Sequence, residues 1–312
     1  MIVKRSFDPR KVAAYVWKDV SIALAVAIAV YLAVSVFGAS WLALSFAPIG
    51  LLGSALSIFL AFRANSSFAR WGEAAQSWAA IGAASRVFGR LIVSFTDSHR
   101  HMPQYHAEAA EAFKHELVYR QIAWCHTLRL QLRGQPEWSQ LAPLLPAADL
   151  AALPEQPNKP QFLMQRQGQR IYEAMASGTL QGFDSFQLEG QLAALTAQQA
   201  VCERIKAIPV PRQYDYFTRL FVRLFVILLP FFLIKTLAAD GAAWLVIPLA
   251  GIIAFLFTTI ERTGAVNEDP FENRITDVPL TATCREIERD LRATLGEAEL
   301  PPRLEPQDGY LF

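Results

Sequence analysis

Four long apolar runs constrain what this chain can fold into more than any other feature of its sequence. The runs are Val20–Phe37, Pro48–Phe62, Leu220–Leu237 and Ala242–Ile260. An apolar run of about 20 residues crosses a bilayer as a helix, because a helix pairs its backbone polar groups within one segment. The only charged residues in these runs, Arg223 and Lys235, lie near the ends of the third one, where long side chains reach the interface. We therefore predict an all-α membrane protein with four transmembrane helices.

The charged residues lie outside these runs and suggest a division of the chain into four parts. We expect an N-terminus with transmembrane helices 1 and 2 (1–62), a cytoplasmic helical region (63–212), transmembrane helices 3 and 4 (213–260) and a cytoplasmic C-terminal segment (261–312). The connections at 38–47 and 238–241 contain no Lys or Arg. By the positive-inside rule, both termini and the region 63–212 are therefore predicted to be cytoplasmic. A formal net charge of +1 gives no general reason to expect nucleic-acid binding.

The second run carries a stripe of side chains that suits the wall of a narrow pore. Ser54, Ile58 and Phe62 recur at every fourth residue, so they share one face of a helix. The neighbouring flank holds small residues, which let helices approach closely: Gly53, Ser57 and Ala61. The same spacing also fits an ordinary packing face between membrane helices. The stripe alone therefore leaves both interpretations open.

Several short motifs resemble those of the bestrophin family. They lie in the order of that family over nearly the whole chain, at Phe62–Trp71, Ile208–Pro211, Leu229–Phe231, Glu268–Phe271 and Asp277–Leu280. The chain is most similar to the short bacterial bestrophins. This resemblance implies a homopentameric, all-helical ion channel in the bacterial inner membrane.

The resemblance also implies where the pore is narrow. In the family the second helix forms a neck, and its pore-facing apolar positions correspond here to Ser54, Ile58 and Phe62. Rings of such side chains gate by dewetting, because an ion in a dry apolar throat loses its hydration. Ser54 replaces the usual bulky residue, so we expect a wider and wetter outer end, with Ile58 and Phe62 doing most of the gating. A second, cytoplasmic aperture would fall at or near Phe183.

Alternatives remain for Phe183, for Arg63 and for a group of three histidines. Phe183 could instead be a core aromatic residue beside Phe186. Arg63 directly follows the neck; it could attract anions into a vestibule, or it could be ion-paired, for instance to an acid in 268–277. The histidines at 99, 101 and 106 are expected to lie in a solvated loop rather than to bind a metal.

A calcium site is not expected, although the family suggests where to look for one. Animal bestrophins follow a Pro-Phe pair with a run of carboxylates, because calcium needs six to eight oxygen ligands. In the corresponding segment here, Arg274 interrupts the run and only Glu272 and Asp277 are acidic. Asn273 and Asp277 are at most a remnant of that site, and helix capping or intersubunit ion pairing better explains the acids. We expect no cofactor.

The function that follows is a passive channel for small monovalent ions. The animal relatives imply chloride, whereas the likeness to bacterial members favours cations. Its expected partners are other copies of itself, the lipid bilayer and the permeant ions, with no nucleic acid. The alternative is a membrane-anchored sensor or enzyme that uses the region 63–212, but the sequence shows no phosphate-binding glycine loop and no nucleophile elbow. We therefore do not expect an enzyme.

Overall fold

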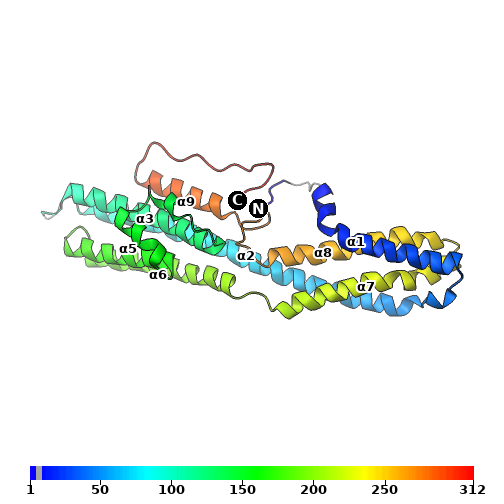
Figure 1. Ribbon diagram of the computed structural model, residues 1–312. Coiled ribbons are helices and arrows are strands. Elements are labelled where there is room, and N and C mark those ends of the chain that lie inside the picture. The colour runs from blue at the N-terminus through cyan, green and yellow to red at the C-terminus, as the bar shows by residue number, and fades with distance from the viewer. Residues whose placement is uncertain (5–8, 104) are drawn as a thin grey trace. The chain divides into compact units, whose positions relative to one another are not determined.

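The computed structural model describes residues 1–4, 9–103 and 105–312, and the side chains of 9–11 are not described. These residues form helices and two isolated β-bridges, with no longer strand among them (Figure 1). The α-helices are α1 (Pro9–Tyr31), α2 (Phe46–Ser98), α3 (Ala107–Arg133), α4 (Ala147–Ala152), α5 (Lys159–Ala176), α6 (Gly182–Ala207), α7 (Arg212–Ala239), α8 (Val246–Asn267) and α9 (Leu280–Thr294). The prediction of an all-α fold is confirmed.

Short 3₁₀ and π segments connect some of these helices. A π-helical turn at Leu32–Val36 continues α1, and 3₁₀ turns lie at Ser40–Leu42, Trp138–Leu141, Leu153–Glu155 and Ala243–Leu245. Gly38 and Gly241 have φ near +70° in the two turns between spanning helices. Glycine adopts this left-handed conformation without the steric cost that other residues meet, so both turns can be tight.

The chain divides into two compact units. The membrane unit comprises the described residues of 4–70 and 209–268, and the helical unit comprises 1–3, 71–208 and 269–312. Helix α2 is continuous and contributes residues to both units. Each unit has its own core, so we describe them separately.

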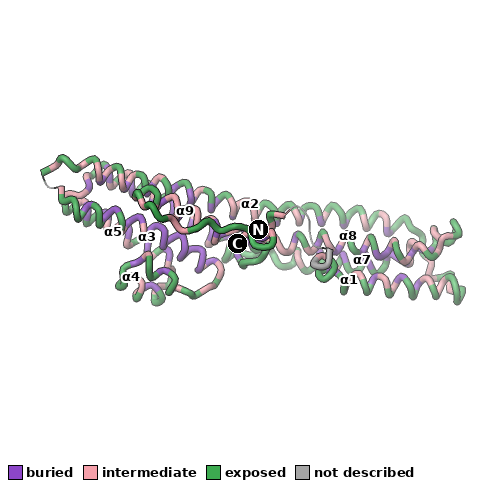
Figure 2. Tube along the Cα trace, turned by 90° about the horizontal axis from the view of Figure 1, so that it is seen from above, coloured by how far each residue is buried: buried purple, intermediate pink, exposed green. Residues whose placement is uncertain are grey.

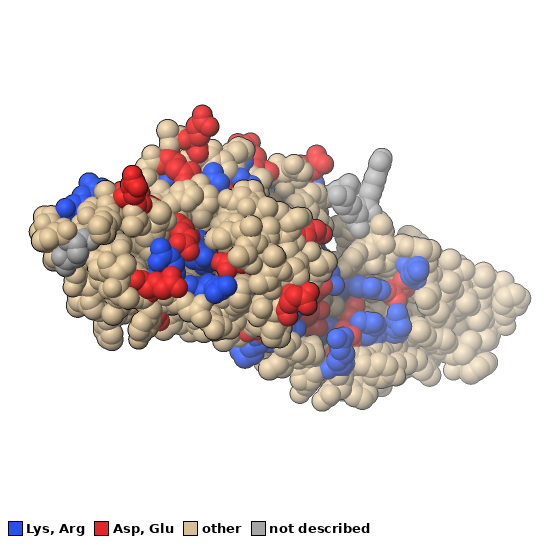
Figure 3. Space-filling model, turned by 60° about the vertical axis from the view of Figure 1, so that its left-hand side comes forward, with Lys and Arg blue, Asp and Glu red and all other residues tan. Residues whose placement is uncertain are grey.

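Four helices of the described chain are long and apolar enough to cross a membrane, which confirms the predicted number. They occupy Val12–Val36, Ser40–Ser98, Arg212–Ala239 and Ala243–Asn267. In the membrane unit, α8 packs against both α1 and α7. Gly251 permits the close approach of α1, since a Cβ atom there would lie 2.8 Å from Cδ2 of Leu24. Figure 3 shows a broad surface without charged side chains at the end formed by the spanning helices.

The helical unit is organised around α3. This helix packs against α5 and α9 and is buried along much of its length, as Figure 2 shows. Large aromatic side chains fill the core, among them Trp78, Phe88, Phe113 and Trp124. The indole of Trp124 donates a hydrogen bond of 3.3 Å to Oε1 of Gln199 on α6. Hydrophobic burial and a few satisfied polar contacts therefore join α2, α3 and α6 in one core.

The two ends of the chain pair with each other inside the helical unit. The amide of Leu311 donates to the carbonyl of Met1 at 2.9 Å, and the amide of Val3 donates to the carbonyl of Gly309 at 2.9 Å. The amide of Ala282 on α9 donates to the carbonyl of Phe312 at 2.8 Å. Backbone hydrogen bonds thus fix the C-terminal segment against the N-terminus and α9 (Figure 1).

A buried histidine links α3 to α9 and makes the helical unit sensitive to pH. Nε2 of His126 lies 3.6 Å from Oε2 of Glu288, and both side chains are nearly inaccessible to solvent. Burial lowers the pKa of His126 below its ordinary value of 6.5. Below pH 6.5 the unfolded chain therefore binds a proton that the folded protein does not, and the free energy of unfolding falls as the pH falls.

We predict that His126→Gln flattens this pH dependence. The melting temperature of the wild type should fall between pH 7.5 and pH 5.5, and that of the variant should fall less, because its side chain at 126 does not titrate. The carboxyl of Glu288 does not interfere: although burial opposes its charged form, contacts with His126 and two arginines keep its pKa below 4.5. His115→Gln, at an exposed position of α3, should keep the wild-type slope. If the melting temperatures of the wild type and of His126→Gln fell equally between pH 7.5 and pH 5.5, the prediction would be wrong.

Candidate functional site

The candidate pore stripe lies on a face of α2 that the rest of the protomer leaves uncovered. Ile58 is 60% exposed and Phe62 is 70% exposed, and Ser54 is exposed as well. Another face of the same helix is buried against α7, through Leu56 and Leu60. The stripe is therefore not a packing face within the protomer. It is free to line a lumen or to contact another molecule.

The serines of this face satisfy their hydroxyl protons within the helix. The hydroxyl of Ser54 donates to the carbonyl of Gly50 at 3.0 Å, and that of Ser66 donates to the carbonyl of Phe62 at 3.0 Å. Such bonds to the preceding turn leave the hydroxyl oxygen able to accept from water. Ser54 can thus be wetted without an unpaired donor, which agrees with the expectation of a wetter outer end.

The flank of small residues behaves differently from the prediction. Gly53 does let another helix approach, since a Cβ atom there would lie 3.1 Å from the ring of Phe225 on α7. Ser57 and Ala61, however, are exposed and do not take part in a close contact within the protomer. Helix α7 still contacts α2 between them, since Tyr214 stacks on Phe59, but a row of residues spaced four apart turns by about 40° per step and leaves the face that packs on α7.

Arg63 lies at the base of the stripe and is the centre of a buried ion-pair network. Its guanidinium donates to Glu261 at 3.2 Å, to Glu268 at 3.0 Å and to the carboxylate of Asp215. The side chain is only 6% exposed. This geometry favours the ion-paired alternative over a charge that faces a vestibule. The network also connects α2 to α7, to α8 and to Glu268, the residue that directly follows α8.

Sequence reasoning named an acid in 268–277 as the partner of Arg63 and missed the other two. Asp215 lies in the first turn of α7, and Glu261 lies in the last third of α8. A signal was present, because a carboxylate near the end of an apolar span is costly unless it is paired. Glu261 carries this signal most clearly, because it directly follows the uncharged run Ala242–Ile260, and in the structure its side chain is only 4% exposed.

Phe183 is exposed at the start of α6. Its ring is 67% exposed, and Phe186 is exposed as well, so the alternative of a core aromatic residue is wrong. The Phe183 ring contacts Phe95 edge-on, with 6.4 Å between the ring centroids. The exposed position is compatible with the aperture that the resemblance implies, and that role stays a prediction.

The loop next to Phe183 is more ordered than expected. Nε2 of His99 lies 2.6 Å from Oδ2 of Asp184, and the amide of Gln181 donates to the same carboxylate oxygen at 2.9 Å. His99 is therefore not a solvated loop residue, whereas His101 and His106 are exposed as predicted. The pair of His99 and Asp184 fixes the first turn of α6, from which Phe183 projects.

The segment compared with a calcium site forms a turn held by its own side chains. Oδ2 of Asp277 accepts a hydrogen bond of 3.1 Å from the amide of Arg274, and Glu272 forms an ion pair with Lys206. Asn273 has φ of 61°, a conformation that asparagine tolerates better than most residues. Burial raises the pKa of the Asp277 carboxyl. Within the described residues, no group of three or more His, Cys, Asp or Glu side chains could hold a metal ion.

The chain is similar to known proteins along most of its length. The family described as "Bacterial/Fungal Bestrophin protein" matches residues 6–293. The voltage-dependent anion channel-forming protein YneE of Escherichia coli (strain K12) is 31% identical over 265 residues, which are 85% of this chain and 81% of that protein. The voltage-dependent anion channel-forming protein mll4386 of Mesorhizobium japonicum is 29% identical over 91% of this chain and 87% of that protein. A crystal structure of a bacterial bestrophin homolog from Klebsiella pneumoniae matches with a TM-score of 0.80 and 25% identity, over 90% of this chain and 99% of that chain.

We predict that Arg63→Gln destabilises the membrane unit strongly. Removing the guanidinium leaves three carboxylates close together and one of them deeply buried, and breaking such a pair costs about 3–5 kcal/mol. Thermal unfolding of the purified protein in detergent measures the loss. The double variant Arg63→Gln with Glu261→Gln should recover part of it, because the buried charge is then also removed.

The surface pair of Arg86 and Asp290 provides the control. Both of its side chains are well exposed, at 52% and 44%. Arg86→Gln should change the stability by less than about 1 kcal/mol, as exposed ion pairs do. If Arg63→Gln lowered the stability no more than Arg86→Gln does, the buried network would not be a major source of stability.

Proposed function

Because this chain belongs to the bacterial and fungal bestrophin family, we propose that it is an ion channel in which five copies surround one central pore. Its relatives are named as channel-forming proteins, which favours a channel over a membrane-anchored sensor or enzyme. The permeant species are small monovalent ions. The membrane is the bacterial inner membrane, and the lack of Lys and Arg at 38–47 and 238–241 supports cytoplasmic termini.

The uncovered stripe of α2 is the observation that carries this proposal. A single such face cannot enclose a conduit, whereas a symmetric ring of copies can, with each copy contributing the same face. The stripe holds no charge, and its large side chains, Ile58 and Phe62, are more than half exposed in the protomer. In a ring they form an apolar neck that opens and closes by wetting and dewetting.

Phe183 provides a second narrowing in the proposed pore. It projects from the first turn of α6, which the contact between His99 and Asp184 holds in place. An exposed aromatic ring in a fixed turn is suited to meet its counterparts from other copies around an axis. We therefore retain Phe183 as the residue of the cytoplasmic aperture.

Two lines of reasoning give different charges for the permeant ion. The likeness to bacterial members favoured cations, whereas the relatives reported above are named as forming anion channels. The neck does not decide between them, because an aromatic ring presents a positive edge to anions and a negative face to cations. The reversal potential of the purified protein in a bilayer with asymmetric NaCl separates the two, because the same concentration gradient gives opposite signs for a permeant cation and a permeant anion.

We predict that Ile58→Ala increases the current. The smaller side chain widens the neck and makes it easier to wet. If the wetting barrier falls by about 0.8 kcal/mol, the worth of one methylene group, the current rises roughly fourfold. Planar-bilayer recordings at fixed voltage measure it. Leu52→Ala removes an alkyl group from another exposed face of the same helix and should leave the current unchanged. Equal effects of the two variants would contradict a lumen at Ile58.

We predict that Ser54→Ile decreases the conductance. A bulky apolar side chain at this position extends the dry part of the neck by one helical turn. Ser54→Thr keeps a hydroxyl and should reduce the conductance less, so the pair separates polarity from bulk. Single-channel recordings give both values. An unaltered conductance in Ser54→Ile would show that Ser54 does not face the ion path.

A further inference from the structure

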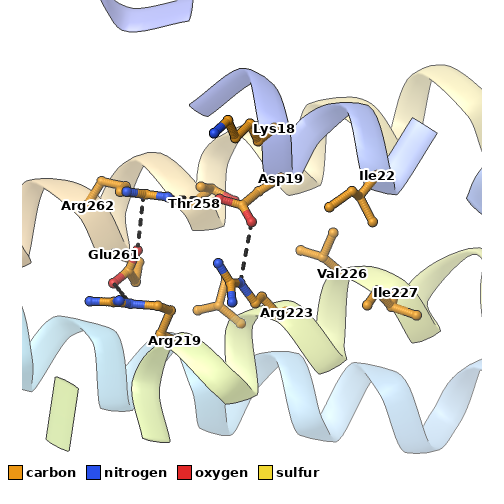
Figure 4. A pocket seen from close by; sticks show the side chains of 11 residues that line it. Lys18, Asp19, Ile22, Arg219, Arg223, Val226, Ile227, Thr258, Glu261 and Arg262 are labelled. Atoms are coloured by element: carbon orange, nitrogen blue, oxygen red, sulfur yellow. Dashed lines mark hydrogen bonds and ion pairs between the residues drawn. The ribbon is translucent and has the colours of Figure 1, made fainter. Parts of the chain in front are cut away.

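A pocket of about 310 Å³ lies in the membrane unit between α1, α7 and α8, away from the stripe of α2. Its charged lining consists of Lys18, Asp19, Arg219, Arg223, Glu261 and Arg262. These residues lie where the charged ends of the three helices meet their apolar runs. In Figure 4, Asp19, Arg223, Glu261 and Arg262 lie near one another, and Lys18 lies beside Asp19 on α1.

The lining of the pocket has four cations and two carboxylates, although one cation, Arg219, is paired at 2.8 Å with Asp215 outside the lining. Asp19 is shared by Arg262, at 3.1 Å, and Arg223, at 3.4 Å. Glu261 already accepts from Arg63 at 3.2 Å, so less of its charge is available to the pocket. Lys18 is exposed and, among the described residues, has no carboxylate within ion-pair distance. Its ammonium group can therefore take an anion as its partner.

A buried hydroxyl in the same pocket has no hydrogen-bond partner. Thr258 is 3% exposed and lines the pocket, yet its Oγ1 makes no hydrogen bond to any described residue. Nε of Arg262, one turn further along α8, makes no hydrogen bond within the described chain, but it forms an ion pair with Oε2 of Glu261 at 3.8 Å. Helical hydroxyls usually donate to the preceding turn, as Thr263 does to the carbonyl of Thr259 at 2.8 Å. Buried polar groups are rarely left without a hydrogen bond, so the Thr258 hydroxyl indicates an acceptor that occupies the pocket.

The other end of the pocket is apolar. Ile22, Val226 and Ile227 form this part of the wall, and Figure 4 shows them apart from the side chains of Arg219 and Glu261. Each of these residues belongs to an apolar run that is expected in the bilayer. A free anion would gain nothing from such a wall. An amphipathic molecule with an anionic group and a hydrocarbon chain would contact both ends.

We propose that this pocket binds the phosphate group of an anionic phospholipid. The phosphate lies between Lys18, Arg223 and Arg262 and accepts hydrogen bonds from the Thr258 hydroxyl and Nε of Arg262. One acyl chain follows Ile22, Val226 and Ile227 into the bilayer. Basic pockets between transmembrane helices bind lipid headgroups in this way. The site shares no lining residue with the proposed neck, so its test does not depend on channel activity.

The test measures lipid binding to the intact purified protein in detergent. Native mass spectrometry, or retention of labelled lipid, gives the affinity for phosphatidylglycerol and for phosphatidylcholine. We expect wild-type protein to prefer phosphatidylglycerol. Lys18→Gln should weaken its binding roughly fivefold, the effect of one cation near a headgroup. Thr258→Val, which keeps the shape of the side chain, should weaken it as well. Lys235→Gln removes the same charge at the other end of α7 and should match the wild type.

Three results would overturn the proposal. In the first, the two lipids bind the wild type equally. In the second, phosphatidylglycerol binds Lys18→Gln and Thr258→Val as tightly as it binds the wild type. In the third, inorganic phosphate would displace the lipid at a similar concentration, and the pocket would then be a site for free anions. Asp19→Asn provides a check in the opposite direction, because it raises the positive charge of the pocket and should tighten binding of phosphatidylglycerol.

Discussion

The buried guanidinium of Arg63 is the contact on which the arrangement of the membrane unit depends. A charge that is 6% exposed is tolerated only when carboxylates surround it, and here they come from α7, α8 and the residue that follows α8. Because these partners lie on one side of α2, they fix the rotation of this helix about its own axis. Leu56 and Leu60 then face α7. Ile58 and Phe62 consequently face away from the rest of the protomer.

This orientation separates the surfaces of the membrane unit by their chemistry. The exposed stripe of α2 is uncharged and presents side chains that favour neither a cation nor an anion. The pocket between α1, α7 and α8 has an excess of positive charge next to an apolar wall. A channel subunit needs one surface for the ion path and another for the surrounding lipid. In the proposed channel the two surfaces are built from different helices.

The sequence was sufficient for features that depend on local patterning. The long uncharged runs predicted the four spanning helices, and the spacing of Ser54, Ile58 and Phe62 correctly placed them on one face. It was insufficient where residues distant in sequence meet. An acid in 268–277 was named as a partner of Arg63, but the spacing of residues does not show which other acids meet it, so Asp215 and Glu261 were missed. The pairing of His99 with Asp184 was missed as well. Ser57 and Ala61 are exposed because a row of residues spaced four apart turns by about 40° per step around a helix and so leaves the face that packs on α7.

The accessibility of position 58 tests the central claim most directly. The native cysteines do not interfere, because Cys125, Cys202 and Cys284 are buried, and burial raises the pKa of the Cys202 thiol to about 11 and that of Cys284 to about 12. A charged, water-soluble thiol reagent applied to Ile58→Cys in a bilayer should react and change the current, whereas Leu52→Cys should show no change. If Ile58→Cys reacted fully without any effect on the current, or did not react at all, the face of α2 that carries Ile58 would not line an ion path.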